Sequence, residues 1–217
     1  MSTAKCIPML SQIAEVHRMA SAIDKSLPDA SCKSLVVGSA CPQEGKTLMT
    51  AALAYYWGSL NQQSILAMDG HWYKPALHQC FDLDQTFSLH ELQQSPTPLQ
   101  LVHTTCNGYL HILPAPTYDP QENTHSEPWL DSALRILHQA KTTYDIVLID
   151  SSPILSMNRN MLDPISLTKA ADGMLLVVKT WTTPRERVKK GKMAVETSGG
   201  KVLGAMVNQC QNPMMGS

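Results

Sequence analysis

The chain has 217 residues and a mass of 23.9 kDa, which fits one sizeable domain. Hydrophobic residues make up 43% and charged residues 16%, so the composition supports a buried core and excludes wholesale disorder. Lys and Arg total 17 against 18 Asp and Glu, and the formal net charge of -1 lacks the basic excess that is typical of nucleic-acid-binding proteins.

The distribution of apolar residues and cysteines bears on the compartment. The apolar runs are far shorter than the roughly 20 residues that span a bilayer, and the first residues lack the apolar block of a signal peptide. The 6 cysteines contain no C-x-x-C pair, which favours reduced thiols over a disulfide framework. We therefore expect a cytoplasmic protein.

Short runs rich in Val, Ile and Leu alternate with helical segments along the chain. Strands are predicted over residues 34–38, 64–69, 109–113, 145–150, 174–178 and 202–207. Helices are predicted over residues 9–25, 46–60, 128–141, 163–171 and 184–197, and loops over residues 93–108 and 114–128. Alternation of strands and helices predicts an α/β fold with a mostly parallel sheet and helices on both of its faces.

A phosphate-binding loop is predicted after the first strand. The segment SACPQEGKT, residues 39–47, ends in Gly-Lys-Thr at the start of an apolar helix. In such a loop the backbone N–H groups and the helix N-terminus face phosphate oxygens, the lysine neutralises the β and γ phosphates, and the hydroxyl binds Mg²⁺. The first glycine of the usual pattern is Ala40 here. A chance Gly-Lys-Thr at a helix start is the alternative interpretation.

Two aspartates end later apolar strands. Asp69 ends the run ILAMD and Asp150 ends the run DIVLID. In phosphoryl-transfer sites an aspartate at this point binds Mg²⁺ directly or through water, although capping of the next turn is a common alternative. Because parallel strands end at one edge of the sheet, we expect Lys46, Asp69 and Asp150 to meet there.

Together these motifs resemble the bacterial tyrosine kinases, which are P-loop proteins of capsule and exopolysaccharide synthesis related to the MinD/ParA ATPases. The resemblance rests on S-x-x-P-x-E-G-K-T, on an aspartate followed by Lys-Pro, and on D-I-V-L-I-D-S-S-P, and it covers about residues 15–208. It implies a single-domain P-loop NTPase. Residues 1–30 would form an N-terminal helical segment, and residues 31–217 an ATP-binding, kinase-like domain.

The resemblance also implies roles for individual residues. The residues that bind the ATP phosphates would be Pro42, Gln43, Glu44, Gly45, Lys46 and Thr47. Thr47 and Asp150 would organise Mg²⁺. Lys46 and Asp69 would be catalytic, with Asp69 as the base or as a metal-linked carboxylate. Asn208, at the end of the last strand, would face the adenine.

The sequence departs from the family pattern in two catalytic features. The second aspartate of the family's D-x-D motif is His71 here, which removes an anionic contact and whose ordinary interpretation is a surface turn residue. The C-terminal residues 209–217 contain no tyrosine, whereas kinases of this family usually carry a tyrosine-rich tail. Among the remaining tyrosines, we expect Tyr118 to be the most accessible.

Features linked to assembly are present only in part. Glu15 and Arg18 match the first half of the family's E-x-x-R-x-x-R ring motif, but the second arginine position is Ser21, so a homo-oligomeric ring would be weaker than is usual. The basic run over residues 185–192 suits acidic lipids or a membrane partner, with a solvated helix face as the ordinary explanation. Cys41 occupies the position at which MinD/ParA ATPases carry their signature lysine.

Three functions fit these observations. The first is an ATP-binding protein-tyrosine autokinase that regulates exopolysaccharide or capsule synthesis and export. The second is a nucleotide-binding regulatory subunit of the export machinery that has lost kinase activity. Either would work with a membrane polysaccharide co-polymerase or activator protein, in the cytoplasm or at the inner face of the membrane. The third, a MinD/ParA-like positioning ATPase, is disfavoured by Cys41.

Overall fold

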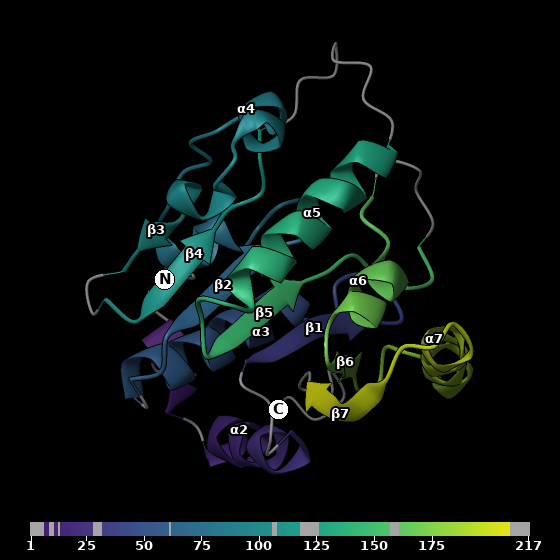
Figure 1. Cartoon of the computed structure of the whole chain (residues 1–217). Helices are drawn as coiled ribbons and strands as arrows, with labels where there is room; N and C mark the ends of the chain where they lie inside the picture. Colours follow the sequence, from purple (N-terminus) through teal and green to yellow (C-terminus); the bar gives the residue numbers. More distant parts are fainter. Residues whose placement is uncertain are drawn as a thin grey trace.

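A seven-stranded sheet forms the centre of the molecule in the computed structural model (Figure 1). The structure describes residues 7–8, 11–12, 14–27, 32–60, 62–105, 108–117, 126–156 and 161–208. The strands are β1 (Lys33–Ser39), β2 (Ile65–Asp69), β3 (His103–Thr104), β4 (Leu110–Leu113), β5 (Ile146–Asp150), β6 (Gly173–Lys179) and β7 (Val202–Asn208). Their order is β3-β4-β2-β5-β1-β6-β7, and only β3 runs antiparallel to its neighbour.

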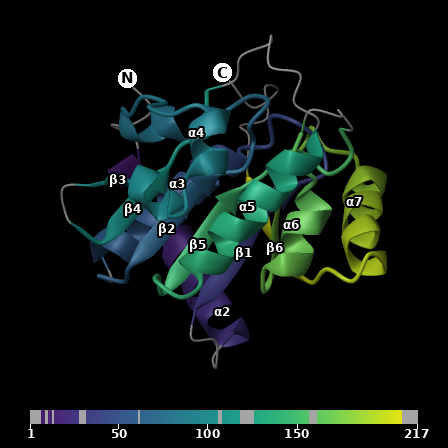
Figure 2. The ribbon, with the colours of Figure 1, turned by 45° about the horizontal axis from the view of Figure 1, so that its top comes forward.

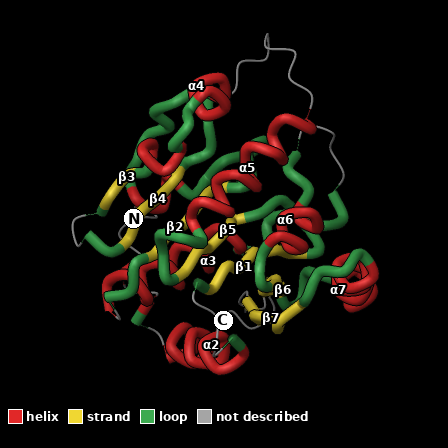
Figure 3. Tube along the Cα trace, in the orientation of Figure 1, coloured by secondary structure: helices red, strands yellow, loops and turns green. Residues whose placement is uncertain are grey.

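Helices lie on both faces of this sheet (Figure 3). They are α2 (Ala14–Ser26), α3 (Lys46–Tyr55), α4 (Leu89–Gln94), α5 (Ser126–Ala140), α6 (Pro164–Ala170) and α7 (Arg185–Thr197). A π-helical turn over Tyr56–Leu60 extends α3, and 3₁₀ turns cover His78–Phe81 and Pro98–Leu101. The described helices do not combine the length and apolar composition that crossing a bilayer requires.

The side chains of the strands divide between two apolar cores. Val36 points to the core that contains residues of α4, α5, α6 and α7, whereas its neighbours Leu35 and Val37 point to the core beneath α2 and α3. Figure 2 shows α5, α6 and α7 side by side across the first face. Because β2 and β5 are central and covered on both sides, every residue in them is buried, which explains their unbroken apolar sequences.

The predicted fold class is confirmed, and each predicted strand is present with ends that differ by at most one residue. The helix predicted over residues 46–60 is α3 with its π-helical turn. The expected loop over residues 93–108 is partly wrong, since it includes the end of α4, a 3₁₀ turn and β3. A two-residue strand such as β3 is too short to show alternation of apolar and polar residues, so it cannot be recognised from the sequence.

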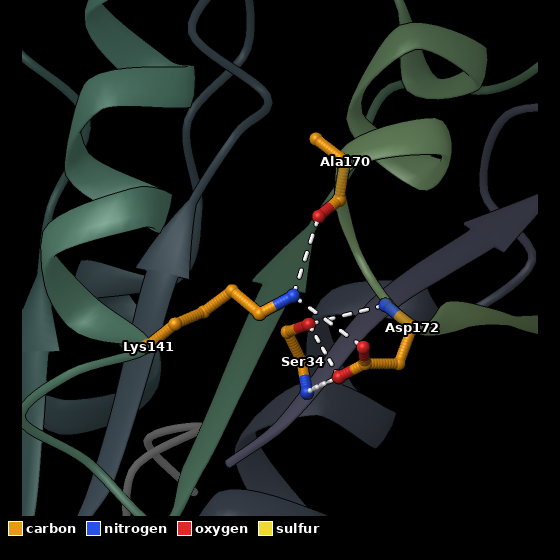
Figure 4. Close-up of polar contacts among 4 residues, drawn as sticks. All are labelled: Ser34, Lys141, Ala170 and Asp172. Carbon is orange, nitrogen blue, oxygen red and sulfur yellow. Dashed lines mark hydrogen bonds and ion pairs between the residues drawn. The ribbon is translucent and has the colours of Figure 1, made fainter. Parts of the chain in front are cut away.

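A polar cluster joins β1, α5 and the turn between α6 and β6 at the opposite end of the strands from the predicted phosphate loop (Figure 4). Asp172 Oδ2 accepts hydrogen bonds from the Ser34 backbone N–H at 2.8 Å and from the Ser34 hydroxyl at 2.7 Å. Lys141 Nζ lies 3.4 Å from Asp172 Oδ1 and also donates to the Ala170 carbonyl. Partial burial by itself would raise the pKa of Asp172, but these hydrogen bonds and the Lys141 charge lower it.

We predict that Asp172→Asn destabilises the protein by about 1–3 kcal/mol at pH 7, because it removes a charge-assisted hydrogen-bond acceptor. The pKa of Asp172 is lower in the folded state than its unfolded value of about 3.9, so this stabilisation is present above that value and is lost as the pH falls through the folded value. Urea unfolding at pH 7 and at pH 3 measures the difference. Asp131→Asn, at an exposed position of α5, is the control; equal losses in both variants would contradict the prediction.

Candidate functional site

The loop between β1 and α3 has the backbone conformation of a tight cradle. Gln43 and Gly45 have φ angles of 61° and 92°, in the left-handed region, and Pro42 and Gln43 are exposed at the tip of the loop. The φ angle of Gly45 favours glycine, and a Cβ atom there would also lie 2.4 Å from Asn208 Nδ2, so the Asn208 side chain would have to shift. The loop turns directly into α3, whose first residue is Lys46.

Lys46 is buried, with 6% of its surface exposed. Its Nζ donates a hydrogen bond to Ser39 Oγ at 3.0 Å, and Ser39 Oγ donates to the Cys41 carbonyl at 2.6 Å. Burial lowers the pKa of Lys46, and the negative charges of Asp150 and Glu44 offset part of that effect. Within the described residues Lys46 forms no ion pair, so its charge has no direct counter-ion.

Asp150 and Thr47 form the second part of the site. Thr47 Oγ1 donates to Asp150 Oδ2 at 2.6 Å, which links the start of α3 to the end of β5. The other oxygen, Asp150 Oδ1, is buried and has no hydrogen-bond partner within the described structure. Burial raises the pKa of Asp150, and the neighbouring charge of Asp69 adds to the rise. A buried carboxylate oxygen without a hydrogen-bond donor fits the role of a ligand for a hard cation.

The structure brings the predicted strand-end residues together. Asp69 and Asp150 are register partners in the pairing of β2 with β5, and Asp150 is also paired with Val37 of β1. Electrostatic interaction links Lys46 to Asp150. Lys46, Asp69 and Asp150 therefore lie at one edge of the sheet, as expected.

Asp69 binds its own loop. Its Oδ1 accepts the His71 backbone N–H at 2.9 Å, and its Oδ2 accepts the backbone N–H groups of Ala76 and Leu77, each at 3.0 Å. Its backbone carbonyl accepts Trp72 Nε1–H at 2.7 Å. Burial raises the pKa of Asp69 even though the three backbone hydrogen bonds oppose that change. In this arrangement the carboxylate holds residues 69–77 beside the phosphate loop.

Glu44 connects the loop to two distant segments, a role that the sequence did not reveal. Its carboxylate accepts the Cys41 backbone N–H at 3.1 Å and the Thr183 hydroxyl, and it is 1% exposed. Asn208 Nδ2 donates to the Glu44 carbonyl at 3.0 Å, so the amide predicted to face adenine contacts the loop backbone. The partners lie 139 and 164 positions away, where no sequence pattern signals their contact.

His71 lines a pocket of about 450 Å³ next to the phosphate loop. The lining residues are Gln43, Gly45, Lys46, Thr47, Leu48, His71, Lys74, Ala76, Gln79 and Cys80. His71 is half-buried, and its Nε2 is buried without a hydrogen-bond partner among the described residues. Burial, with the charges of Lys46 and Lys74, lowers the pKa of His71 to about 4, so the ring is neutral near pH 7. It is therefore a pocket residue, which differs from the expected surface turn residue.

The remaining predicted features contribute less to the site. Glu15 and Arg18 form an exposed pair at 3.8 Å within α2, which is worth little in water. Tyr118 and the C-terminal residues 209–217 lie outside the described residues. No cluster of three or more His, Cys, Asp or Glu side chains able to hold a metal occurs in the described ranges. The donor set at Thr47 and Asp150 instead suits a hard cation that takes its other ligands from phosphate and water.

Sequence comparison finds relatives but no matching family model. The chain is 30% identical over 182 residues to the tyrosine-protein kinase YwqD of Bacillus subtilis (strain 168), covering 83% of this chain and 73% of that protein. It is 26% identical to the succinoglycan biosynthesis transport protein ExoP of Rhizobium meliloti (strain 1021), covering 92% of this chain and 25% of ExoP.

Solved structures share the fold at lower identity. The kinase domain of the Escherichia coli tyrosine kinase ETK matches with a TM-score of 0.79 and 20% identity, covering 93% of this chain and 77% of that domain. The septum site-determining protein MinD of Pyrococcus horikoshii OT3, complexed with Mg-ADP, matches with a TM-score of 0.64 and 21% identity, covering 82% of this chain and 70% of MinD. At these identities the likeness establishes the fold.

We predict that Thr183→Val destabilises the protein by about 1–3 kcal/mol, because valine keeps the shape of threonine but leaves a buried oxygen of Glu44 without its donor. Guanidinium unfolding measures the loss. Thr182→Val is the matched control, since the Thr182 hydroxyl is exposed and makes only a 3.4 Å contact with the Thr180 carbonyl. If the two variants are equally stable, Glu44 does not depend on Thr183.

Proposed function

Because the chain belongs to the bacterial tyrosine-protein kinase family, we propose that it binds Mg·ATP at residues 42–47 and transfers the γ-phosphoryl group to a tyrosine. One observation carries the proposal. Within the described residues, the Lys46 ammonium forms no ion pair and Asp150 Oδ1 has no hydrogen-bond partner, and both groups lie at the same sheet edge. Phosphate oxygens and a divalent cation supply the two charges that these groups lack.

The residues of the loop would act by position and charge. Its backbone N–H groups and the N-terminus of α3 face the phosphates, and Lys46 stabilises the negative charge that develops on the transferred group. Glu44 keeps the loop in this shape through the Thr183 hydroxyl and the Cys41 N–H. Asn208 lies against the same loop, where its amide would border the adenine.

Thr47 and Asp150 would hold Mg²⁺ through oxygen atoms, the ligands that this ion prefers. When bound, the ion neutralises charge on the phosphate oxygens. The MinD relative in fold was solved with Mg-ADP, which supports this assignment for the same fold. The Thr47 hydroxyl now donates to Asp150, so the two oxygens are already side by side.

Asp69 is the proposed proton acceptor for the incoming hydroxyl. Its Oδ2 accepts two backbone N–H groups and its Oδ1 accepts one, so Oδ1 keeps a second acceptor position for the incoming proton. His71 stands where the family has a second aspartate, and its neutral ring adds no negative charge to the site. Phosphoryl transfer should therefore be slower than in relatives with both carboxylates.

We assign the protein to the control of polysaccharide synthesis and export. ExoP, a relative named as a succinoglycan biosynthesis transport protein, is about four times as long as the matched region, since this chain covers 25% of it. We propose a membrane polysaccharide co-polymerase or activator protein as the partner of this chain. The proposed location is the inner face of the membrane, and the proposed assembly is a homo-oligomeric ring.

A kinase-deficient regulatory subunit is the second candidate. One feature favours it, namely His71 in place of an aspartate. Such a subunit would bind Mg·ATP at the same loop but would not label tyrosine.

Incubation of the purified protein with γ-labelled ATP and Mg²⁺, followed by phosphoamino-acid analysis, separates the candidates. Labelled tyrosine supports the kinase, free labelled phosphate alone indicates an ATPase, and nucleotide binding without either product supports the regulatory subunit. Lys46→Ala should abolish nucleotide binding, whereas Lys169→Ala, at an exposed lysine of α6, should not. Unchanged binding in the Lys46 variant would mean that the site is wrongly placed.

We predict that Asp150→Asn weakens ATP binding by about 10–100-fold when Mg²⁺ is present, and much less when EDTA replaces it. The reason is that asparagine keeps the size of the side chain but removes the anionic oxygen. Titration with a fluorescent ATP analogue measures both affinities. Thr47→Ser, which keeps the hydroxyl, should retain the Mg²⁺ dependence; a wild-type response to Mg²⁺ in Asp150→Asn would exclude the carboxylate as a ligand.

A further inference from the structure

Helix α7 concentrates positive charge on the surface of the molecule. Its exposed basic residues are Arg185, Arg187, Lys189, Lys190 and Lys192, which we call the cationic face. With two glutamates, the helix carries a net charge of +3, so the rest of the chain, at an overall charge of -1, carries -4. Figures 1 and 2 both place α7 at the periphery of the molecule, beyond the end of the sheet.

The charges of this face are not used within the protein. Lys192 pairs with Glu196 at 3.6 Å on the same helix, and both side chains are about half exposed. The other four basic side chains form no ion pair with any described residue. Intramolecular pairing therefore does not account for the accumulation of cations on one helix.

Large apolar side chains lie exposed beside these cations. Trp181, in the loop that leads into α7, is 81% exposed, and Met193 on the helix is 63% exposed. Trp181 and Arg185 line the same surface hollow, so the indole lies next to the first turn of the cationic face. The other tryptophans, Trp57, Trp72 and Trp129, are at most 5% exposed. An exposed indole keeps its apolar surface in water, which is unfavourable. Burial of the Trp181 side chain against another surface would be favourable.

We propose that the cationic face of α7, with Trp181, is a docking surface for an anionic lipid bilayer. Each Lys or Arg near an anionic leaflet contributes favourable energy, and Trp is the side chain most suited to the headgroup region. The surface would act as a peripheral contact, since no described helix could span the membrane.

The distribution of the charges favours a bilayer over an acidic peptide. A peptide site needs a groove with polar groups placed to bind particular side chains, whereas these basic side chains are exposed and spread over two turns of a helix. A bilayer presents a broad, averaged negative surface that matches such a spread.

Sedimentation with lipid vesicles tests the proposal on the full chain. We expect binding to phosphatidylcholine vesicles that contain about 30% phosphatidylglycerol, no binding to pure phosphatidylcholine, and loss of binding at about 0.5 M salt. Brominated phospholipids should quench the fluorescence of Trp181 selectively, because the other three tryptophans are buried. No adsorption to the anionic vesicles at low salt would overturn the proposal.

Matched variants place the contact on the molecule. Lys189→Glu should weaken vesicle binding by about tenfold or more, whereas Lys25→Glu, the same change of charge at an exposed position of α2, should have little effect. Trp181→Ala should remove the quenching. Equal losses from both lysine variants, or adsorption without quenching, would overturn the assignment of this face. Polyglutamate can be added to the vesicle assay as a competitor. If it abolishes binding to the vesicles, the ligand of this face is an acidic polypeptide instead.

The proposal does not depend on the nucleotide site. Lys46→Ala, which should abolish nucleotide binding, is expected to retain wild-type vesicle binding, because Lys46 is buried and lies outside the cationic face. Failure of the kinase proposal and failure of the lipid proposal are thus separate outcomes.

Discussion

The site depends on a buried ammonium and a buried carboxylate that share one sheet edge without contacting each other. Burial opposes the charged forms of both Lys46 and Asp150, and the attraction between them offsets only part of that cost. Thr47 donates to one oxygen of Asp150, and the other oxygen has no partner in the part of the chain that the structure describes. An arrangement that stays incomplete among the described residues is consistent with the proposed binding of Mg·ATP.

The surrounding structure holds this arrangement in place. The central strands β1 and β5 fix the distance between the two charges through their register, since Val37 and Asp150 are paired. Asp69 organises residues 69–77 on one side, and Glu44 ties the loop to Thr183 on the other. Gln43, a non-glycine residue in the left-handed region, needs such support, because its strain is compensated by contacts elsewhere.

The sequence predicted short motifs and strands with a regular apolar pattern, and it missed contacts between residues that are far apart in the chain. The unbroken apolar run before Asp150 reflects burial on both faces of the sheet, so β5 could be recognised from composition. Parallel strands end at one edge, and this rule alone placed Lys46 near Asp150. The contact of Glu44 with Thr183 crosses 139 positions, and the burial of His71 depends on how residues 69–77 close around Asp69. Neither has a periodic signature.

The same contacts connect the phosphate loop to the cationic face. Thr183, the partner of Glu44, lies two residues from both Trp181 and Arg185. A Cβ atom on Gly191 in the middle of α7 would lie 3.4 Å from Ala40 Cβ at the start of the loop, so the helix packs directly on that loop. Tightly packed elements cannot shift independently. A bilayer that bound α7 would therefore hold the phosphate loop in a fixed orientation to the membrane.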